Sequence, residues 1–203
     1  MNHPNIIKAY EVVNTLKEAR FICGLTEGQN LSRYILAGER FSEKQLATLI
    51  YSLLKGIQYI HNNGIVHRDL KPENIMLKIS EGTVHAKITD FGLSRVILPR
   101  DLLIEQSGTL LFMAPEILLK YGYGQEVDLW SLGITLYYVL TRDYPFETND
   151  KMNIKEILNY DAQKDERLDK VSIQGGNLLY NRYSEGYSDE IVGKRSKEEN
   201  YSC

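Results

Sequence analysis

The sequence of 203 residues contains few cysteines and no long apolar run. Its two cysteines, Cys23 and Cys203, cannot form a disulfide framework and have no metal-site spacing, so we expect a reducing compartment. No run approaches the roughly 18 apolar residues of a membrane span, and Met1–Tyr10 lacks the pattern of a secretory signal. These absences predict a cytoplasmic location, with the nucleus as the alternative, and no membrane partner.

An excess of positive charge is also missing. The chain has 24 Lys and Arg against 27 Asp and Glu, a net charge of −3, so we expect no nucleic-acid partner. With 43% apolar and 25% charged residues, the chain can bury a core, and its length suits one domain. We find no internal repeat.

Four polar side chains between residues 65 and 92 carry complementary chemistry. Asp69, Lys71 and Asn74 share one short segment, and Asp90 follows the next predicted hairpin. Phosphoryl transfer needs a base near the acceptor hydroxyl and neutralisation of phosphate charge. Asp69 could serve as that base and Lys71 could meet the γ-phosphate, while Asn74 and Asp90 offer the oxygen ligands that Mg²⁺ prefers.

The motifs around these residues resemble those of the eukaryotic protein kinases. His67–Asn74 has the sequence H-R-D-L-K-P-E-N, and Asp90–Gly92 has the sequence D-F-G. Ala114–Glu116 matches the A-P-E motif, and the D-L-W-S-L-G run at Asp128–Gly133 resembles the central helix of that family. The resemblance covers residues 3 to 158. It implies an α+β, protein-kinase-like fold, mostly the helical C-lobe with only a remnant of the N-lobe sheet.

The resemblance also implies an activity. Lys71, two residues after Asp69, points to serine or threonine as the acceptor, because the tyrosine-directed branch typically has an A-A-R run there. We therefore expect a serine/threonine protein kinase that transfers the γ-phosphate of ATP to protein hydroxyls, with ATP and Mg²⁺ as cofactors. Its partners would be ATP and a protein substrate with a Ser or Thr acceptor.

Further site residues follow from the same resemblance. Cys23 falls at the gatekeeper position and the next three residues at the hinge that meets adenine, although an ordinary edge strand and loop remain the alternative. Met76 would form the floor beneath adenine, or else be an ordinary core methionine. The expected nucleotide-binding residues are Gly24, Leu25, Thr26, Glu73, Met76 and Thr89. The residues expected to order the active site are His67, Arg68, Phe91, Gly92, Glu105, Thr109, Glu116 and Asp128.

The resemblance gives several of these residues a partner. His67 and Phe91 would stack, Thr109 would bond Asp69 and Lys71, and Asp128 would brace the backbone of the catalytic loop. Glu105 lies three residues before Gly108, where many such kinases have a phosphorylated Thr or Ser. We hypothesise that Glu105 pairs with Arg68 as an acidic substitute for phosphate. A solvated loop glutamate is the alternative.

The apolar pattern predicts two helices. Residues 41–63 repeat leucine and isoleucine at helical spacing, with Ser42 and Gln45 as a capping box and Asn63-Gly64 as the stop. Residues 127–140 are apolar around most of the circumference, which is typical of a buried helix. His61, near the end of the first helix, is expected to be structural.

Two hairpins are also predicted. Tyr10–Val13 and Arg20–Cys23 flank a turn at residues 14–18, and residues 75–77 and 84–88 flank Ser80-Glu81-Gly82. Pairing of the second two strands would bring Asn74 and Asp90 to the same side.

The domain boundaries follow from where the resemblance fades. We expect a partial kinase domain over residues 1–160, with the N-lobe remnant at 1–26 and the C-lobe at 27–160. Residues 161–203 would form a divergent, poorly ordered polar tail. The arginine that would meet Glu116 is not recognisable, with Arg182 and Arg195 as candidates.

Three functional hypotheses remain open at this point. The family's glycine-rich loop and its lysine strand do not fit before His3, so the chain could be a fragment of an active kinase. It could also be a catalytically deficient interaction module. A small-molecule phosphotransferase could share the aspartates but would not be expected to carry the A-P-E motif.

Overall fold

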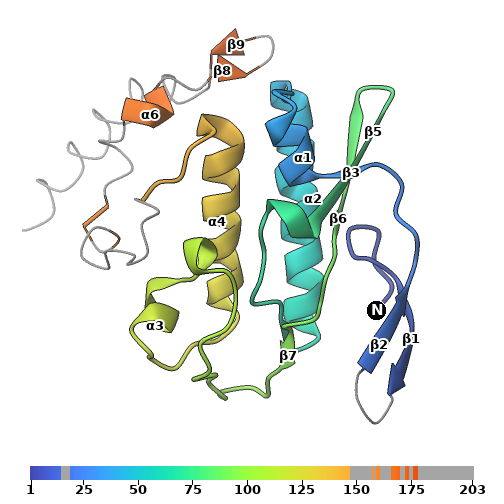
Figure 1. The fold of residues 1–203 in the computed structure, drawn as a ribbon, viewed down its shortest axis with the longest axis vertical. Coiled ribbons are helices and arrows are strands. Elements are labelled where there is room, and N and C mark those ends of the chain that lie inside the picture. Colours follow the sequence, from blue (N-terminus) through green and yellow to red (C-terminus); the bar gives the residue numbers. More distant parts are fainter. Residues whose placement is uncertain are drawn as a thin grey trace, which may run out of the picture.

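The computed structural model describes residues 1–14, 19–146, 157, 159–160, 166–169, 172–173 and 176–177. Two long helices form its centre, α2 (Glu43–Asn62) and α4 (Glu126–Thr141), and small antiparallel sheets lie on the α2 side (Figure 1). The α+β fold predicted from the sequence is therefore confirmed. None of the described helices is both long and apolar enough to cross a membrane.

Helix α2 begins and ends within two residues of the predicted bounds. The Gln45 amide donates to Ser42 Oγ over 3.3 Å, and Gln45 Oε1 accepts from the Ser42 amide over 2.9 Å, so the capping box is present. Its buried face consists of Leu46, Leu49, Ser52, Leu53, Gly56, Ile57 and Ile60. Periodicity and capping together explain why this segment forms a helix.

Helix α4 extends one residue beyond the prediction at each end. The helix ends at Thr141, and its C-cap residue, Arg142, adopts a left-handed φ of 65°. Its Leu132 and Val139 join the residues of α2 in one core cluster, so the two helices pack through their apolar faces. The long β5–β6 hairpin and Ile6 from the N-terminal segment contribute to the same core.

The β5–β6 hairpin comprises Ile75–Ser80 and Thr83–Ile88, and the predicted turn is confirmed at Glu81-Gly82. Ile75 pairs with Ile88 at the open end, which places the residues before β5 beside the residues after β6. The short strand β3 (Gln29–Asn30) pairs with β5 on its other side. Strand β6 is thus the edge of a three-stranded sheet.

The other predicted hairpin is present as β1 (Ala9–Asn14) and β2 (Ala19–Cys23), whereas residues 15–18 lie outside the described part. The other elements are α1 (Leu31–Leu36), β4 (Ile65–Val66), η1 (Pro72–Asn74), β7 (Arg95–Val96), η2 (Leu110–Phe112), α3 (Pro115–Leu118), α6 (Glu166–Asp169), β8 (Ser172–Ile173) and β9 (Gly176–Asn177). Most of residues 153–158 and 161–203 lies outside the described residues, including Arg182 and Arg195.

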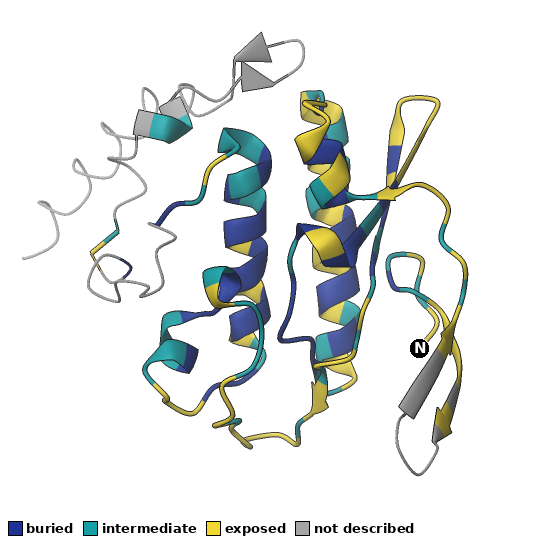
Figure 2. Cartoon of the chain, viewed as in Figure 1, coloured by how far each residue is buried: buried dark blue, intermediate teal, exposed yellow. Residues whose placement is uncertain are grey.

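Buried residues concentrate on α2, α4, β6 and the loop that follows β4 (Figure 2). That loop, Val66–Leu70, is buried although it contains a histidine, an arginine and an aspartate. Buried polar groups need hydrogen-bond partners, so the surroundings of this loop must supply them. Residues of the candidate active site supply these hydrogen-bond partners.

Candidate active site

The buried loop is fastened to α4 by one carboxylate. Asp128 accepts the amides of His67 and Arg68, each over 2.9 Å, and lies 2.8 Å from Nε2 of His61. Arg68 adopts a left-handed φ of 69°, a conformation unfavourable for a non-glycine residue. The Asp128 side chain, fully buried, satisfies both amides around this bend and so holds the loop in place.

The loop presents Asp69 to three side chains. Asp69 Oδ1 accepts the amide of Thr109 over 3.0 Å and its hydroxyl over 2.7 Å. Asp69 Oδ2 lies 2.8 Å from Nζ of Lys71 and accepts Nδ2 of Asn74 over 3.1 Å. Lys71 Nζ also donates to Thr109 Oγ1 over 2.7 Å. Residues from two separate parts of the sequence therefore fix one carboxylate.

These contacts determine the charge of Asp69. Burial, the largest single influence, raises the pKa of this carboxyl, and the hydrogen bonds from Lys71 and Thr109 lower it. The attraction of Lys71 and the hydrogen bond from Asn74 lower the pKa further, so it lies below its usual value. Asp69 is therefore ionised at neutral pH and can accept a hydrogen bond from an alcohol.

The hairpin brings Asp90 next to this group. Thr89 donates to the Asn74 carbonyl through its amide over 2.9 Å and through its hydroxyl over 3.1 Å. Asp90 follows with a left-handed φ of 60°, and its exposed carboxylate accepts the Gly92 amide over 3.2 Å. Asn74 and Asp90 thus lie at the same end of the hairpin.

The donor set at this end fits magnesium. Nδ2 of Asn74 is used by Asp69, which leaves its amide oxygen for another ligand. Within the described ranges no cluster of three or more His, Cys, Asp or Glu side chains could hold a metal alone. One amide oxygen and one carboxylate suit Mg²⁺, which is commonly held by one or two carboxylates together with substrate phosphates.

His67 joins the loop to the segment after the hairpin. Its ring meets the ring of Phe91 edge-on at 4.9 Å, and Nε2 lies 3.0 Å from the Thr89 carbonyl oxygen. Burial lowers the pKa of His67, which keeps the ring neutral at physiological pH. The residue is a packing and hydrogen-bonding link rather than a charged group.

Glu105 lies beside Arg68, as hypothesised from the sequence. Nη1 of Arg68 donates to Oε2 of Glu105 over 3.0 Å, and Nη2 of Arg95 lies 3.5 Å from the same oxygen. The Tyr123 hydroxyl donates to the Glu105 carbonyl over 2.6 Å. The Arg68 hydrogen bond, followed by the charges of Arg95 and Arg68, lowers the pKa of Glu105. The glutamate is thus held by two arginines at the surface.

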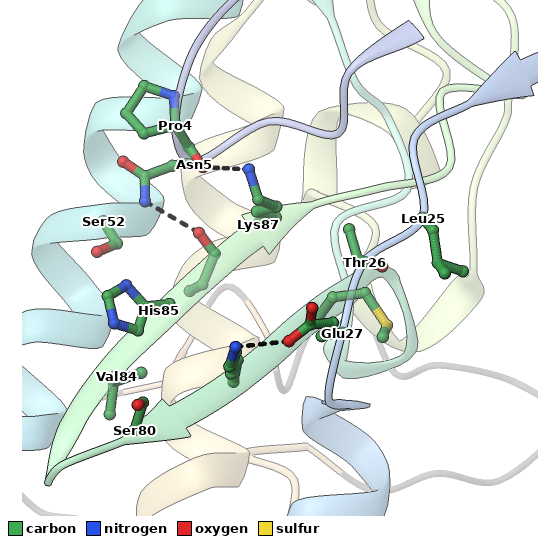
Figure 3. Close-up of a pocket in the computed structure, with 13 residues that line it drawn as sticks. Pro4, Asn5, Leu25, Thr26, Glu27, Ser52, Ser80, Val84, His85 and Lys87 are labelled. Carbon is green, nitrogen blue, oxygen red and sulfur yellow. Dashed lines mark hydrogen bonds and ion pairs between the residues drawn. The ribbon is translucent and has the colours of Figure 1, made fainter.

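Two of the predicted hinge residues line a cavity together with Met76. Leu25, Thr26 and Met76 line a cavity of about 530 Å³ whose lining includes neither Asp69 nor Asp90 (Figure 3). Met76 is half-buried and belongs to none of the core clusters of the described chain. The Gly24 amide donates to the Lys8 carbonyl over 2.7 Å.

Two remaining candidates lie at the periphery. Glu73 is exposed on η1. The pKa of Tyr144 is raised to about 12, most of all by burial, then by Tyr138 and then by the charge of Glu73. Glu116 is half-buried in α3. Both candidate arginines for Glu116 lie outside the described residues.

Sequence reasoning missed two residues of the site. His61 was expected to be structural, but its contact with Asp128 could not be foreseen from helical spacing. Tyr123 is 1% exposed and holds the Glu105 backbone, although no motif marks it. Its position between two glycines, Gly122 and Gly124, gave no signal of burial.

Known proteins share these motifs over most of the chain. The protein kinase domain family matches residues 1–185. Human calcium/calmodulin-dependent protein kinase type IV is 40% identical over 161 residues, which are 78% of this chain and 34% of that protein. Mouse sperm motility kinase 2B is 42% identical over 147 residues, 72% of this chain and 30% of that protein.

A third relative is more distant in origin. The probable serine/threonine-protein kinase fhkE of Dictyostelium discoideum is 40% identical over 162 residues, which are 77% of this chain and 23% of that protein. The chain spans about a third or less of the length of these curated relatives. With the family match over residues 1–185 and the motifs around Asp69 and Asp90, the chain belongs to the eukaryotic protein kinase family, of the serine/threonine type.

Proposed function

We propose that this chain provides the catalytic loop and magnesium ligands of an ATP-dependent serine/threonine protein kinase. The observation that carries the proposal is the Asp69 carboxylate, kept ionised and oriented by Lys71 and Thr109 within 3.0 Å. An ionised, fixed carboxylate can orient an alcohol for in-line attack.

The proposed reaction moves the γ-phosphate of ATP to the acceptor hydroxyl. The acceptor hydroxyl donates a hydrogen bond to Asp69, its oxygen attacks the γ-phosphorus of ATP, and the bond from that phosphorus to the β,γ-bridging oxygen breaks. The proton passes to the Asp69 carboxylate and ADP leaves. Lys71 would neutralise charge on the transferred group. Bound Mg²⁺, held by Asn74 and Asp90 with phosphate oxygens, would supply further neutralisation.

Glu105 belongs to the regulation of this site in our proposal. Its contact with Arg68 joins the activation segment, which runs from Leu93 to Glu116, to the residue beside Asp69. A carboxylate provides less charge and fewer acceptor oxygens than a phosphate, but it is present without modification. We propose that Glu105 orders the segment in place of a phosphorylated residue.

A single-turnover assay tests the proposed reaction. The 203-residue chain, in excess over labelled ATP and Mg²⁺, is mixed with peptides that differ only in a Ser, Thr or Tyr acceptor. We expect label on Ser and Thr, and a loss of at least about 100-fold in Asp69→Asn because proton transfer and positioning fail together. Asp90→Asn should lose activity because a metal ligand is weakened, whereas Asp101→Asn, on the same exposed segment as Glu105, should not.

Two results would contradict the proposal. Equal transfer by the parent and the Asp69→Asn chain would exclude Asp69 as the acceptor-orienting base. A complete protein containing this chain that is folded and transfers no phosphate to any peptide would favour the alternative of an interaction module.

A further inference from the structure

The edge of β6 opens into the cavity described above. In the β5–β6 hairpin Ser80 pairs with Thr83 across a two-residue turn, so backbone groups of even-numbered residues in β6 point away from β5. Ile88 follows this rule, since its amide donates to the Asn5 carbonyl and its carbonyl accepts the Ile7 amide, each over 2.9 Å. Val84 and Ala86 therefore direct their backbone groups to the same edge.

The N-terminal segment covers only one end of this edge. Ile6 pairs with Ile88 in parallel, and the Asn5 side chain donates to the Ala86 carbonyl over 2.9 Å. Beyond that point, no described residue bonds the Ala86 amide or the Val84 amide and carbonyl at this edge. Val84 and Ala86 are 2% and 1% exposed, and buried backbone groups without partners are rare.

The cavity continues the groove in which the N-terminal segment lies. Gly56 of α2 faces the N-terminal segment, where an added Cβ would lie 3.2 Å from the Asn5 carbonyl oxygen. Ser52, about one helical turn earlier, lines the cavity. In Figure 3, β6 runs between Asn5 and Ser52 on one side and Thr26 and Glu27 on the other. Its volume of about 530 Å³ falls within the range of ligand pockets.

The charges around the cavity favour an acidic occupant. Its lining contains Lys78, Lys87 and His85 against one acid, Glu27, which Lys78 already pairs at 2.5 Å. Lys87 donates to the Pro4 carbonyl over 2.7 Å, so its positive charge has no carboxylate partner among the described residues. His85 is exposed beside it on the outer face of the hairpin.

We propose that this groove binds an extended acidic peptide of another protein, which adds to the open edge of β6. Its backbone would pair with Val84 and the Ala86 amide, as in β-strand addition. Because side chains alternate along a strand, every second residue would face Lys87 and His85, and the residues between would face Ser52. A peptide that alternates small apolar and acidic residues fits this chemistry. Asp69 and Asp90 do not line this cavity, whereas Leu25, Thr26 and Met76, which are expected to meet adenine, line its other side.

The probe is acetyl-Val-Glu-Val-Glu-Val-amide, titrated into the ¹⁵N-labelled 203-residue chain. We expect saturable binding below about 1 mM, with slowed hydrogen exchange at the amides of Val84 and Ala86. Methylation of the central valine nitrogen should weaken binding by about tenfold if that amide pairs with the edge, and a lysine-for-glutamate peptide should not bind.

Variants of the chain provide the controls. Lys87→Gln can still donate to Pro4 but removes the charge, so acidic-peptide affinity should fall, whereas Lys44→Gln, an exposed lysine of α2 outside the lining, should not change it. Ser52→Leu should block the groove; if it does not fold, the methylated peptide and Lys87→Gln still decide. Absence of binding, or binding that leaves the exchange of Val84 and Ala86 unchanged, would overturn the proposal.

Discussion

At Asp69, burial and hydrogen bonding act in opposite directions on one carboxyl group. Burial raises its pKa, and Lys71, Thr109 and Asn74 together lower it further than burial raises it. A carboxylate with a low pKa is a weak base, so it orients the hydroxyl early and takes the proton late in the reaction. This order suits phosphoryl transfer through a loose transition state, in which the nucleophile needs little activation.

The contact of Glu105 with Arg68 can be tested by substituting this single residue. Glu105→Ala in the complete protein should lower kcat/KM several-fold, because Arg68 and Arg95 lose the carboxylate that ties the activation segment to the catalytic loop. The measurement is steady-state phosphorylation of a serine peptide.

Asp101→Ala serves as the matched control, since it removes an exposed acidic side chain four residues away. Loss of activity in Glu105→Ala alone would support the substitute role. If the Glu105→Ala protein were as active as its parent, Glu105 would be an ordinary surface glutamate.

At the level of elements, the β5–β6 hairpin decides the geometry of the site. Its register places Ile75 opposite Ile88, so Asn74 before one strand and Thr89 after the other hydrogen-bond directly. Asp90 is the residue after Thr89, so the same contact also sets its position. Helix α4 has a corresponding role, because the Asp128 carboxylate in its first turn fixes the bend at Arg68.

The capping box of α2 predicts a measurable loss of stability. Ser42→Ala removes the side chain that accepts the Gln45 amide and should lower the free energy of unfolding by about 1 kcal/mol. Urea unfolding followed by circular dichroism measures this change.

Thr48→Ala tests whether the loss belongs to the cap. Thr48 is half-buried within α2 and its hydroxyl donates to the Lys44 carbonyl over 2.8 Å, so alanine there should leave stability unchanged or raise it. Equal destabilisation by both substitutions would mean that the Ser42 contact contributes nothing specific.

On the scale of the whole molecule, a single core cluster holds together segments that are distant in sequence. Ile6, the β5–β6 hairpin, α2 and α4 all contribute to it. The catalytic loop lies against this core, which explains how a polar loop can be buried yet satisfied by Asp128, Thr89 and Thr109. Changes in the charge of the loop should therefore affect global stability.

Stability should fall as the solution becomes acidic. Burial holds the pKa of His67 below its unfolded value of 6.5, so the unfolded chain binds a proton that the folded chain excludes. The stability contributed by neutral His67 is present above about pH 6.5 and is lost as pH falls below that value toward the folded pKa. Asp69, whose pKa is also lowered, adds a second loss below its unfolded value of 3.8.

Urea midpoints from pH 7.5 to pH 5.0 test this expectation. His3→Gln is the control, because burial also lowers the pKa of His3, but that residue is only partly buried. The variant should retain most of the decline. A midpoint independent of pH over this range would show that the folded chain binds as many protons as the unfolded chain, and would contradict the lowered pKa of His67.

The sequence by itself determined the helices at residues 41–63 and 127–140, both hairpins and the motifs around Asp69 and Asp90. These features depend on local spacing, capping and turn chemistry, which neighbouring residues specify. The same motifs predicted that Glu105 would lie near Arg68, and the ion pair at 3.0 Å agrees with that hypothesis.

Only the tertiary structure decided the contacts that depend on packing between distant segments. Two of these contacts, His61 with Asp128 and Tyr123 with Glu105, join residues more than 15 apart in the sequence. The open edge of β6 depends on which strands pair in the folded sheet. No local pattern encodes such contacts, because they arise when the core brings α2, α4 and the hairpin together.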